Sequence, residues 1–405
     1  MSRALEAGRT PEVVPSRLTA TPQDGGALDR ARLRRRPDDG EQAYDAADLL
    51  LLDTAAAWWA AGHPADGVVV LDDRWGALTL PLVAAGHTVR TAQDARGGEL
   101  ALAENAATLD LTAPAPRPVD ADTVAGARTV LMPLPRSLDA LADWAHLVAE
   151  HAAEDVVLLA GGRDKHMTRS MNEVLEQHFA DVVPGRGRSK SRVLTARSPR
   201  RGLPAPGPRR AVHAVAPIDE LTLCSTGTTY GGTSVDPGTR RLLAAVDGLA
   251  AFEAELAAAD RLVDLGCGNG TVAAWAARRR PQAQVLAVDD SASATASTTL
   301  TAEANAVADR VEVRRADELE DVAADGGERL ILLNPPFHRG NAVDPTAAHR
   351  LIASAGRALA PGGTLYCVWN SHLQHRAALR RFVGPTRQLA RDRKFTVTVS
   401  EKPAG

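Results

Sequence analysis

The stretch RLVDLGCGNGTVAAWAARRR, residues 261–280, decides how the second half of the chain folds. An apolar run leads into three alternating glycines, and a helical pattern follows from Thr271. Gly266, Gly268 and Gly270 permit a tight turn and the close approach of a ligand to the backbone. The helix behind them presents free N–H groups and the positive end of its dipole. The stretch therefore predicts a strand, a ligand-binding turn and a helix, which together are typical of an α/β sheet.

Around this turn, short β-branched runs alternate with longer helical stretches, as in a doubly wound, mostly parallel sheet. The strands expected in the second half are residues 261–266, 284–290, 310–317, 329–336, 364–370 and 394–402. The last strand follows a short connection from residues 386–392, so we expect an antiparallel hairpin to close that edge of the sheet.

The first half of the chain looks like a degenerate copy of the second. VVVLDDRWGAL (68–78) aligns with LVDLGCGNGTV (262–272), and TVLMPLPRSL (129–138) aligns with LILLNPPFHR (330–339). In this alignment Asp72 and Arg74 replace two glycines of the turn, and Met132 stands in the place of Asn334. We predict a polar extension over 1–42, a degenerate domain over 43–197, a basic Pro- and Gly-rich linker over 198–218 and an intact domain over 219–405. Within the extension, the basic run 30–40 is read as a solvated face, with phosphate contact as the alternative.

Composition narrows the class of protein. The 405 residues suit two domains, and the net charge of −3 means that any nucleic-acid surface must be local. Three scattered cysteines exclude a disulfide framework and are typical of a reducing cytoplasm. Neither an apolar leader nor a run of 18 apolar residues is present, so we expect a cytoplasmic protein without membrane contact. His372 and His375 lack a third ligand, so no metal site is expected, and we expect a monomer.

Polar residues stand at four successive strand ends, which in an open α/β sheet face one crevice. Asp264 can order the glycine turn and attract a ligand ammonium group. Asp289, followed by Asp290, can accept ribose hydroxyls, and Asp317 can meet an exocyclic adenine amine. Asn334 ends the fourth strand, before two prolines that stiffen the chain. Taken singly, each aspartate could equally be a solvated loop residue or a helix cap.

These motifs together resemble a known family. The glycine turn with its strand-end acids is similar to class I S-adenosylmethionine-dependent methyltransferases. NPPFHRGNAVD (334–344) and NSHLQHRAALRRFVG (370–384), with GGRDKHMTRSMNEVLEQHF (161–179) in the first half, resemble the bacterial ribosomal-RNA guanine-N2 methyltransferases. That family carries tandem Rossmann-like methyltransferase domains, and the resemblance favours its large-subunit (23S) branch over the small-subunit (16S) branch. Residues 229–243 also resemble its segment that runs over the cofactor, although glycines replace bulkier residues there.

The resemblance implies S-adenosyl-L-methionine as cofactor, ribosomal RNA as partner and a site with two sets of residues. The catalytic set is Asn334, Pro335, Pro336 and Phe337. The cofactor-binding set is Asp264, Gly266, Cys267, Gly268, Asn269, Gly270, Asp289, Asp290, Asp317 and Asn334. The degenerate first domain is expected to bind no cofactor. Alternatives are methylation of adenine N6, cytosine N4 or a protein glutamine, or a non-catalytic RNA-binding role in ribosome assembly.

An RNA surface is expected in the stretch 182–218, which has basic residues and no acidic ones. Such residues neutralise phosphates, although a solvated linker face is the alternative. The candidates are Arg186, Arg188, Lys190, Arg192, Arg200 and Arg201. Aromatic residues make up only 3% of the chain, too few for a long stacking platform, so we expect structured RNA with its target guanine unpaired or flipped out.

Overall fold

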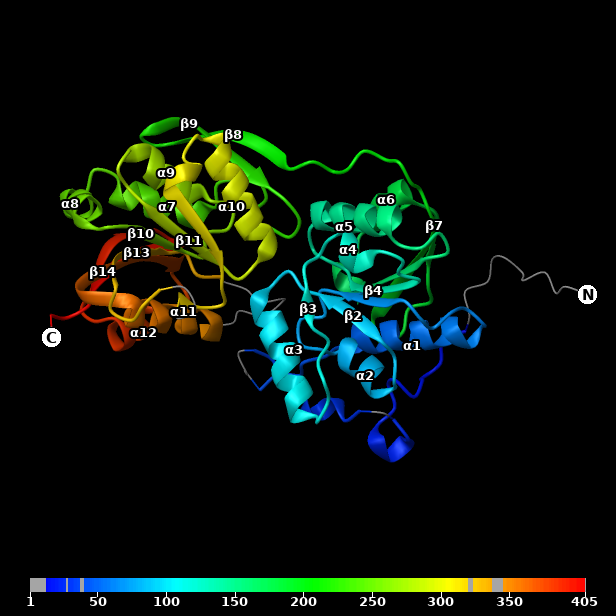
Figure 1. Cartoon of the computed structure of the whole chain (residues 1–405). Coiled ribbons are helices and arrows are strands. Elements are labelled where there is room, and N and C mark those ends of the chain that lie inside the picture. The colour runs from blue at the N-terminus through cyan, green and yellow to red at the C-terminus, as the bar shows by residue number, and fades with distance from the viewer. Residues whose placement is uncertain (1–11, 27, 37–39, 320–322, 337–344, 405) are drawn as a thin grey trace, which may run out of the picture. The chain divides into compact units, whose positions relative to one another are not determined.

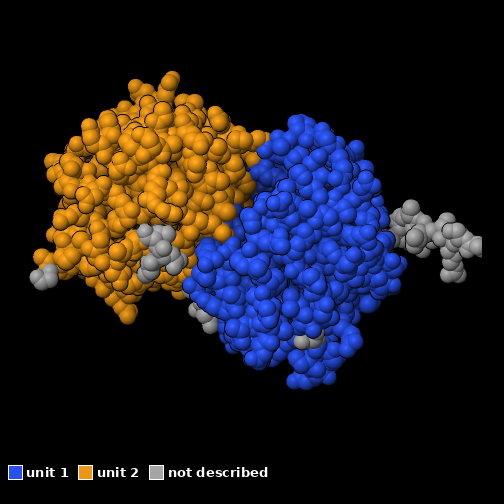
Figure 2. Space-filling model, in the orientation of Figure 1, with its two compact units in different colours: residues 1–206 blue, residues 207–405 orange. Residues whose placement is uncertain are grey.

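The computed structural model describes residues 12–26, 28–36, 40–319, 323–336 and 345–404. The chain divides into two compact units, residues 1–206 and 207–405, which Figure 2 shows in different colours. Within the described residues each unit contains one seven-stranded sheet flanked by helices (Figure 1). The expected α/β fold with two mostly parallel sheets is therefore confirmed.

The sheet of the second unit has the strand order β12-β11-β10-β13-β14-β16-β15 in the described part of the chain. The first five strands of this order are parallel, and β16 is antiparallel to both β14 and β15. The strands are β10 (Leu262–Leu265), β11 (Val285–Asp289), β12 (Val311–Arg315), β13 (Glu328–Leu333), β14 (Leu359–Asn370), β15 (Thr386–Arg391) and β16 (Phe395–Glu401). The expected strands and the closing hairpin are all present.

Two apolar layers cover this sheet, because alternate strand residues point to opposite faces. Leu262 and Leu332 belong to a buried cluster with helices α7 to α10, whereas Val263 and Leu333 belong to one with α11 and α12. The helices of this unit are α7 (Pro237–Val246), α8 (Ala250–Ala258), α9 (Thr271–Arg279), α10 (Ala292–Ala304), η4 (Ala308–Arg310), α11 (Pro345–Ala358) and α12 (Arg376–Phe382).

The first unit repeats this topology, with the order β3-β2-β1-β4-β5-β7-β6 among the residues described. Its strands are β1 (Val68–Leu71), β2 (Val89–Ala92), β3 (Pro116–Arg117), β4 (Thr129–Pro133), β5 (Val157–Arg163), β6 (Phe179–Pro184) and β7 (Ser191–Pro199). Its helices are η1 (Pro22–Asp24), η2 (Arg30–Arg32), α1 (Ala46–Ala60), α2 (Thr79–Ala84), α3 (Arg96–Thr108), α4 (Ala121–Val124), α5 (Leu138–His151), η3 (Asp164–His166) and α6 (Arg169–His178). Strand for strand, the two sheets have the same order.

Part of the stretch read as a linker over 198–218 is a strand. Residues 209–215 form β8 (Arg209–Val215), which pairs with β9 (Ile218–Ser225) in an antiparallel hairpin of the second unit. The hairpin is held to α10, where the Thr301 hydroxyl accepts a hydrogen bond from the Cys224 amide at 2.9 Å. Within 198–218, residues 198 and 199 end β7, residues 200–208 lack regular structure, and residues 216 and 217 form the turn between β8 and β9.

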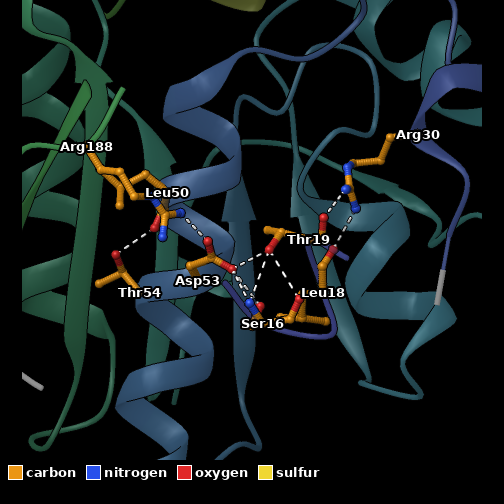
Figure 3. A network of polar contacts seen from close by, with 8 residues as sticks. All are labelled: Ser16, Leu18, Thr19, Arg30, Leu50, Asp53, Thr54 and Arg188. Carbon is orange, nitrogen blue, oxygen red and sulfur yellow. Dashed lines mark hydrogen bonds and ion pairs between the residues drawn. The ribbon is translucent and has the colours of Figure 1, made fainter. Parts of the chain in front are cut away.

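The N-terminal segment is packed onto the first unit, contrary to a purely solvated reading of its basic run. Arg30 is buried and donates to the carbonyl of Leu18 at 2.9 Å. The buried carboxylate of Asp53 in α1 accepts hydrogen bonds from the amide and hydroxyl of Ser16, at 2.8 and 2.7 Å, and also pairs with Arg188 (Figure 3).

Candidate active site

The glycine turn between β10 and α9 has the conformation that its sequence predicts. Gly266, Gly268 and Gly270 have φ angles of 77°, 55° and 78°, which is left-handed backbone that side chains disfavour. The amide of Gly266 donates to the Val288 carbonyl at 2.8 Å, fixing the turn against β11. A Cβ atom on Gly268 would meet nothing within 4 Å, so this glycine keeps open space in front of the turn.

Asp264 ties the turn to the helix behind it. Its carboxylate is buried and accepts a hydrogen bond from the Ala273 amide, in the first turn of α9, at 3.1 Å. Burial raises the pKa of Asp264 to about 7, and the nearby charge of Asp289 acts in the same direction, against the hydrogen bond. A cationic group bound beside this carboxyl would lower its pKa and hold it ionised.

Asp289 lies at the end of β11 and already supports the turn. One carboxylate oxygen accepts from the Gly268 amide at 2.9 Å, and the other accepts from the Ser291 amide at 3.0 Å. Each carboxylate oxygen can accept more than one hydrogen bond, so these two contacts do not by themselves exclude a ligand hydroxyl. Asp290 lines the same cavity.

Asp317, at the end of β12, lies beside a cation that the sequence analysis did not single out. The guanidinium of Arg350 in α11 pairs with Asp317 and with Glu318. Both Asp317 and Arg350 line the cavity, and Asp317 is mostly buried. An adenine amine would therefore meet an acid that is already paired with an arginine.

Cys267 and Asn269 hold the turn to its surroundings. The Asn269 amide nitrogen donates to the carbonyls of Gly232 and Ser234, at 2.8 and 2.9 Å, and so secures the segment before α7. Burial raises the pKa of the Cys267 thiol well above its usual range, and Thr298 donates to its sulfur at 3.2 Å. This thiol is a neutral packing group rather than a nucleophile.

Asn334 has its amide orientation set by two residues from another element. Its Nδ2 atom donates to the carboxylate of Asp236 at 2.8 Å and to the hydroxyl of Thr239 at 3.0 Å. Asp236 is the N-cap of α7 and also accepts from the Thr239 amide at 2.9 Å. The remaining Oδ1 atom is buried and has no hydrogen-bond partner among the described residues. A carboxylate accepts only, so Asp236 selects the rotamer that leaves Oδ1 as a free acceptor.

These groups line one cavity of about 370 Å³. Its lining brings together eight cofactor candidates, from Asp264 through the glycine turn to Asp317, with Asn334, Pro335 and Pro336. Gly270 alone of the predicted set is not in its lining; its Cβ position faces Thr298 at 2.9 Å. Phe337 lies outside the described residues. The lining also includes Tyr230, Ser234, Asp236 and Thr239, which belong to residues 229–243, the segment that resembles one running over the cofactor. Ser291 and Arg350 line the cavity too and were not singled out in the sequence. The DPGT sequence at 236–239 does signal a helix start, but not its contact with Asn334.

The residues present fit the cofactor that the resemblance implies. The cavity volume lies in the range of small-molecule sites. Gly268 leaves room for a ligand, a buried carboxyl stands ready for an ammonium group, and Asn334, whose Oδ1 atom has no partner among the described residues, lines the same cavity. For metals, the described residues hold no group of three or more possible His, Cys, Asp or Glu ligands. Within the same part of the chain, no helix is long and apolar enough to cross a membrane.

The predicted RNA-binding side chains are only partly available. Arg188 pairs with buried Asp53, and Arg192 lies 3.6 Å from Asp164. Arg201 donates to two carbonyl groups at the end of α5, at 2.7 Å for the one of Glu150. Arg186, Lys190 and Arg200 are exposed.

The first unit lacks the side chains of this site. In the first unit, Thr129 of β4 pairs with Val68 of β1. In the second unit, Leu330 of β13 pairs in the same way with Leu262 of β10, so Pro133, and not Met132, stands in the place of Asn334. The aligned stretches 129–138 and 330–339 give the same match, so the placement of Met132 against Asn334 is wrong by one residue. Val70 stands in the place of Asp264, and Gln93 follows β2 where Asp289 ends β11. None of these replacements restores the lost acid or amide.

Comparisons with known proteins agree with this geometry. Residues 24–200 match the model of the RLMG N-terminal domain, and residues 220–399 match that of the methyltransferase small domain. The ribosomal RNA large subunit methyltransferase G of Streptomyces avermitilis is 33% identical over 92% of this chain and 96% of its own length. The chain belongs to the ribosomal RNA large subunit methyltransferase G family. The member from Magnetococcus marinus is 31% identical over 93% of this chain and 98% of its own length.

A solved structure extends the likeness to the fold. The T. thermophilus 16S rRNA N2 methyltransferase in complex with AdoMet and guanosine superposes with a TM-score of 0.72. It is 22% identical and covers 90% of this chain and 94% of its own, so it shares the fold of the methyltransferase G family over nearly the whole length.

Proposed function

We propose that this protein transfers a methyl group from S-adenosylmethionine to the exocyclic N2 amine of a guanine in large-subunit ribosomal RNA. The observation that carries the proposal is the fixed, unpartnered Oδ1 atom of Asn334 beside the cavity. Family membership supports the RNA substrate, because the relatives are named for large-subunit ribosomal RNA.

When bound, the cofactor supplies an electrophilic methyl group on a sulfonium. The N2 amine of guanine is a poor nucleophile because its lone pair is delocalised into the ring. Asn334 Oδ1 and the carbonyl of Pro335 accept its two N–H groups and favour the pyramidal, cationic nitrogen of the transition state. The bound cofactor would give up the methyl group by displacement at carbon and leave as a neutral thioether, and N2 would then lose a proton to solvent.

The chain's own contribution is positioning and electrostatic preorganisation. Pro335 and Pro336 stiffen the corner, and Asp236 and Thr239 hold the Asn334 amide before substrate arrives, so little reorganisation is needed. Asp264 receives the amino group of the cofactor, and Asp289 receives its ribose hydroxyls. Stacking of the target base on Phe337 remains part of the proposal.

We also propose that both units descend from one class I methyltransferase domain and that only the second is catalytic. Their identical strand order supports this. The first unit would then support the second or recruit RNA through its exposed cations.

The proposal is tested by methyl transfer from labelled cofactor to deproteinised ribosomal RNA, followed by nucleoside analysis. N2-methylguanosine is expected; methyladenosine, methylcytidine or labelled protein instead would refute the substrate. Asn334→Ala should lower kcat by roughly 10²- to 10³-fold, the range for lost preorganised polar groups, and keep the cofactor Kd. Asn370→Ala, the same change at the end of β14 and outside the cavity, is the matched control and should keep its activity.

A further inference from the structure

A cationic turn lies beside the candidate active site and is not used by the chemistry above. The residues between β15 and β16, with the ends of those strands, read RDRKF over 391–395. Arg391, Arg393 and Lys394 are exposed, and none of the three forms an ion pair with an acid among the described residues. The Lys394 ammonium lies 5.2 Å from the centre of the Phe395 ring, and its charge attracts that of Asp392. We call these three side chains the cationic turn.

Asp392, the only acid among residues 391–395, already has partners within the fold. One oxygen of Asp392 accepts from the amides of Lys394 and Phe395, both at 2.7 Å. Its other oxygen lies 3.2 Å from the guanidinium of Arg241 in α7. These backbone hydrogen bonds are the main reason that the pKa of Asp392 lies below its usual value, so the carboxylate stays charged and held. Asp392 therefore shapes the turn, and Arg241 balances its charge.

The cationic turn is joined to the catalytic corner through Phe395. Phe395 pairs with Asn370 at the end of β14, at the edge of the sheet where the parallel strands end. A Cβ atom on Gly238 would lie 3.3 Å from the Phe395 ring and 3.2 Å from Oδ1 of Asn334, so the three residues meet. The backbone is also fixed, because the Ser371 amide donates to the Lys394 carbonyl at 2.9 Å. The three cations thus extend from a fixed backbone next to Phe395, which lies close to Asn334 of the cavity lining.

We infer that the cationic turn binds phosphates of the RNA strand that flank the target guanine. The inference rests on the proposed function, because it takes the cavity to hold a guanine of an RNA chain. A nucleotide whose base enters the cavity brings its neighbouring phosphates close to the cationic turn. The three cations there complement the charge of the phosphates, because Asp392, the one acid of the turn, already has partners within the fold. Phosphate contacts of this kind position the substrate without reading its sequence.

The test compares two triple variants with equal changes of charge. Arg391→Gln, Arg393→Gln and Lys394→Gln together remove the cationic turn. Arg380→Gln, Arg381→Gln and Arg387→Gln remove three exposed cations of α12 and β15 that lie further along these elements. Binding to an unmodified transcript of large-subunit ribosomal RNA is measured by filter retention from 50 to 300 mM salt, alongside methylation kinetics and calorimetry with the cofactor.

The turn variant should show an RNA Kd and KM raised by roughly 10- to 100-fold near 0.1 M salt, with the slope of log Kd against log salt reduced by about 2, since each single-strand phosphate contributes about 0.7. Its cofactor Kd and its kcat at saturating RNA should stay unchanged. The control variant should lose much less, and a turn variant with Arg391→Lys and Arg393→Lys should keep the wild-type salt slope.

An unchanged RNA affinity and slope in the turn variant, or an equal loss in the control, overturns the inference. A loss of cofactor affinity in the turn variant would equally contradict it, because the phosphate role predicts none. Failure of the proposed function has a different signature: wild-type protein then transfers no methyl group to guanine N2. The filter-retention slopes still decide whether the turn contacts RNA in that case.

Discussion

The turn after the first strand occurs twice in this molecule, with the same backbone and different side chains. In the first unit Asp72, Arg74 and Gly76 have φ angles of 57°, 56° and 85°; in the second, Gly266, Gly268 and Gly270 have 77°, 55° and 78°. The Asp72 amide donates to the Ala92 carbonyl at 2.8 Å, as the Gly266 amide does to that of Val288.

The comparison separates what makes the turn from what makes the site. Left-handed backbone survives with an aspartate and an arginine in place of two glycines, although side chains disfavour it. The first unit has instead lost the glycines at positions 72 and 74, the acid in the place of Asp264 and the amide in the place of Asn334. Its turn keeps a different buried acid, Asp73, which accepts hydrogen bonds from the Leu78 and Thr79 amides. Glycine in the second turn is therefore needed for a ligand more than for the fold, and the following predictions test this view.

The largest effect is expected when Gly268 in the turn of the second unit is replaced by arginine, the residue that the first unit has at the equivalent position, Arg74. Gly268→Arg should leave the protein folded, since Arg74 holds the same φ, and should abolish detectable cofactor binding by calorimetry and all methyl transfer. Gly362→Arg is the matched control, because Gly362 also has positive φ and open space but lies outside the cavity. Cofactor binding by Gly268→Arg would show that the open space is not used.

The next effect concerns the amide that the first unit replaces with Pro133. Asp236→Ala should free the Asn334 side chain to rotate and lower kcat by roughly 10- to 100-fold, as expected for misplaced catalytic groups. The cofactor Kd should change little, and Asp236→Asn, which still offers an acceptor, should restore most of kcat.

Loss of the cap also costs stability, about 1 kcal/mol. Ser137→Ala removes an N-cap of the first unit and controls for that cost, because Ser137 does not touch Asn334. If Asp236→Ala and Ser137→Ala reduce kcat alike, the positioning role is wrong.

A pH-dependent effect should follow from Asp264, which the first unit replaces with Val70. The folded-state pKa of about 7 lies above the ordinary 3.8, so the folded protein binds an extra proton between these values. Stability without cofactor should therefore fall as pH rises from about 4 to 7 and then level off. Asp264→Asn should raise the melting temperature more at pH 8 than at pH 5.

The same carboxyl must be ionised to hold an ammonium group, so cofactor affinity should weaken by up to about tenfold per pH unit below 7. Calorimetry between pH 5.5 and 8 measures this, and Asp264→Asn should bind weakly at every pH. An affinity of the wild-type protein that is constant over this range contradicts contact between Asp264 and the ligand.

The smallest effect is expected in the first unit itself. Arg74→Gly relieves left-handed strain but loosens the unfolded chain, so the free energy of unfolding should rise by no more than about 1 kcal/mol. Calorimetry should still find one cofactor per chain, because Val70 and Gln93 remain. Two bound cofactors would show that side-chain obstruction alone had closed the first site.

Local pattern was enough for the fold, and for the part of the site that lies on strand ends. Short β-branched runs that alternate with helical stretches locate the strands, and the glycine spacing locates the predicted cofactor turn, because both depend on near neighbours in sequence. The acids at 264, 289 and 317 follow from the rule that ligands bind beyond strand ends.

Contacts between segments that are far apart in the chain could not be predicted from the sequence. Asp236 and Asn334 are 98 residues apart, and Arg188 meets Asp53 across 135 residues. Nothing in a run of arginines tells which ones pair inside the fold, so Arg188 was predicted to meet RNA. The placement of Met132 against Asn334 is an error of a different kind: the aligned stretches 129–138 and 330–339 already set Pro133 against Asn334, and the hydrogen-bond register agrees.

The buried carboxylate of Asp53 has a consequence for where the first unit begins. It collects donors from Ser16 and Thr19 before the first long helix and from Arg188 near the end of the unit (Figure 3). A chain shortened to start at Ala43 would keep the acid and lose both N-terminal donors, which is costly for a charge that cannot reach water. The polar N-terminal segment therefore completes the interior of this unit. Through Asp53, it is joined to Arg188 near the other end of the unit.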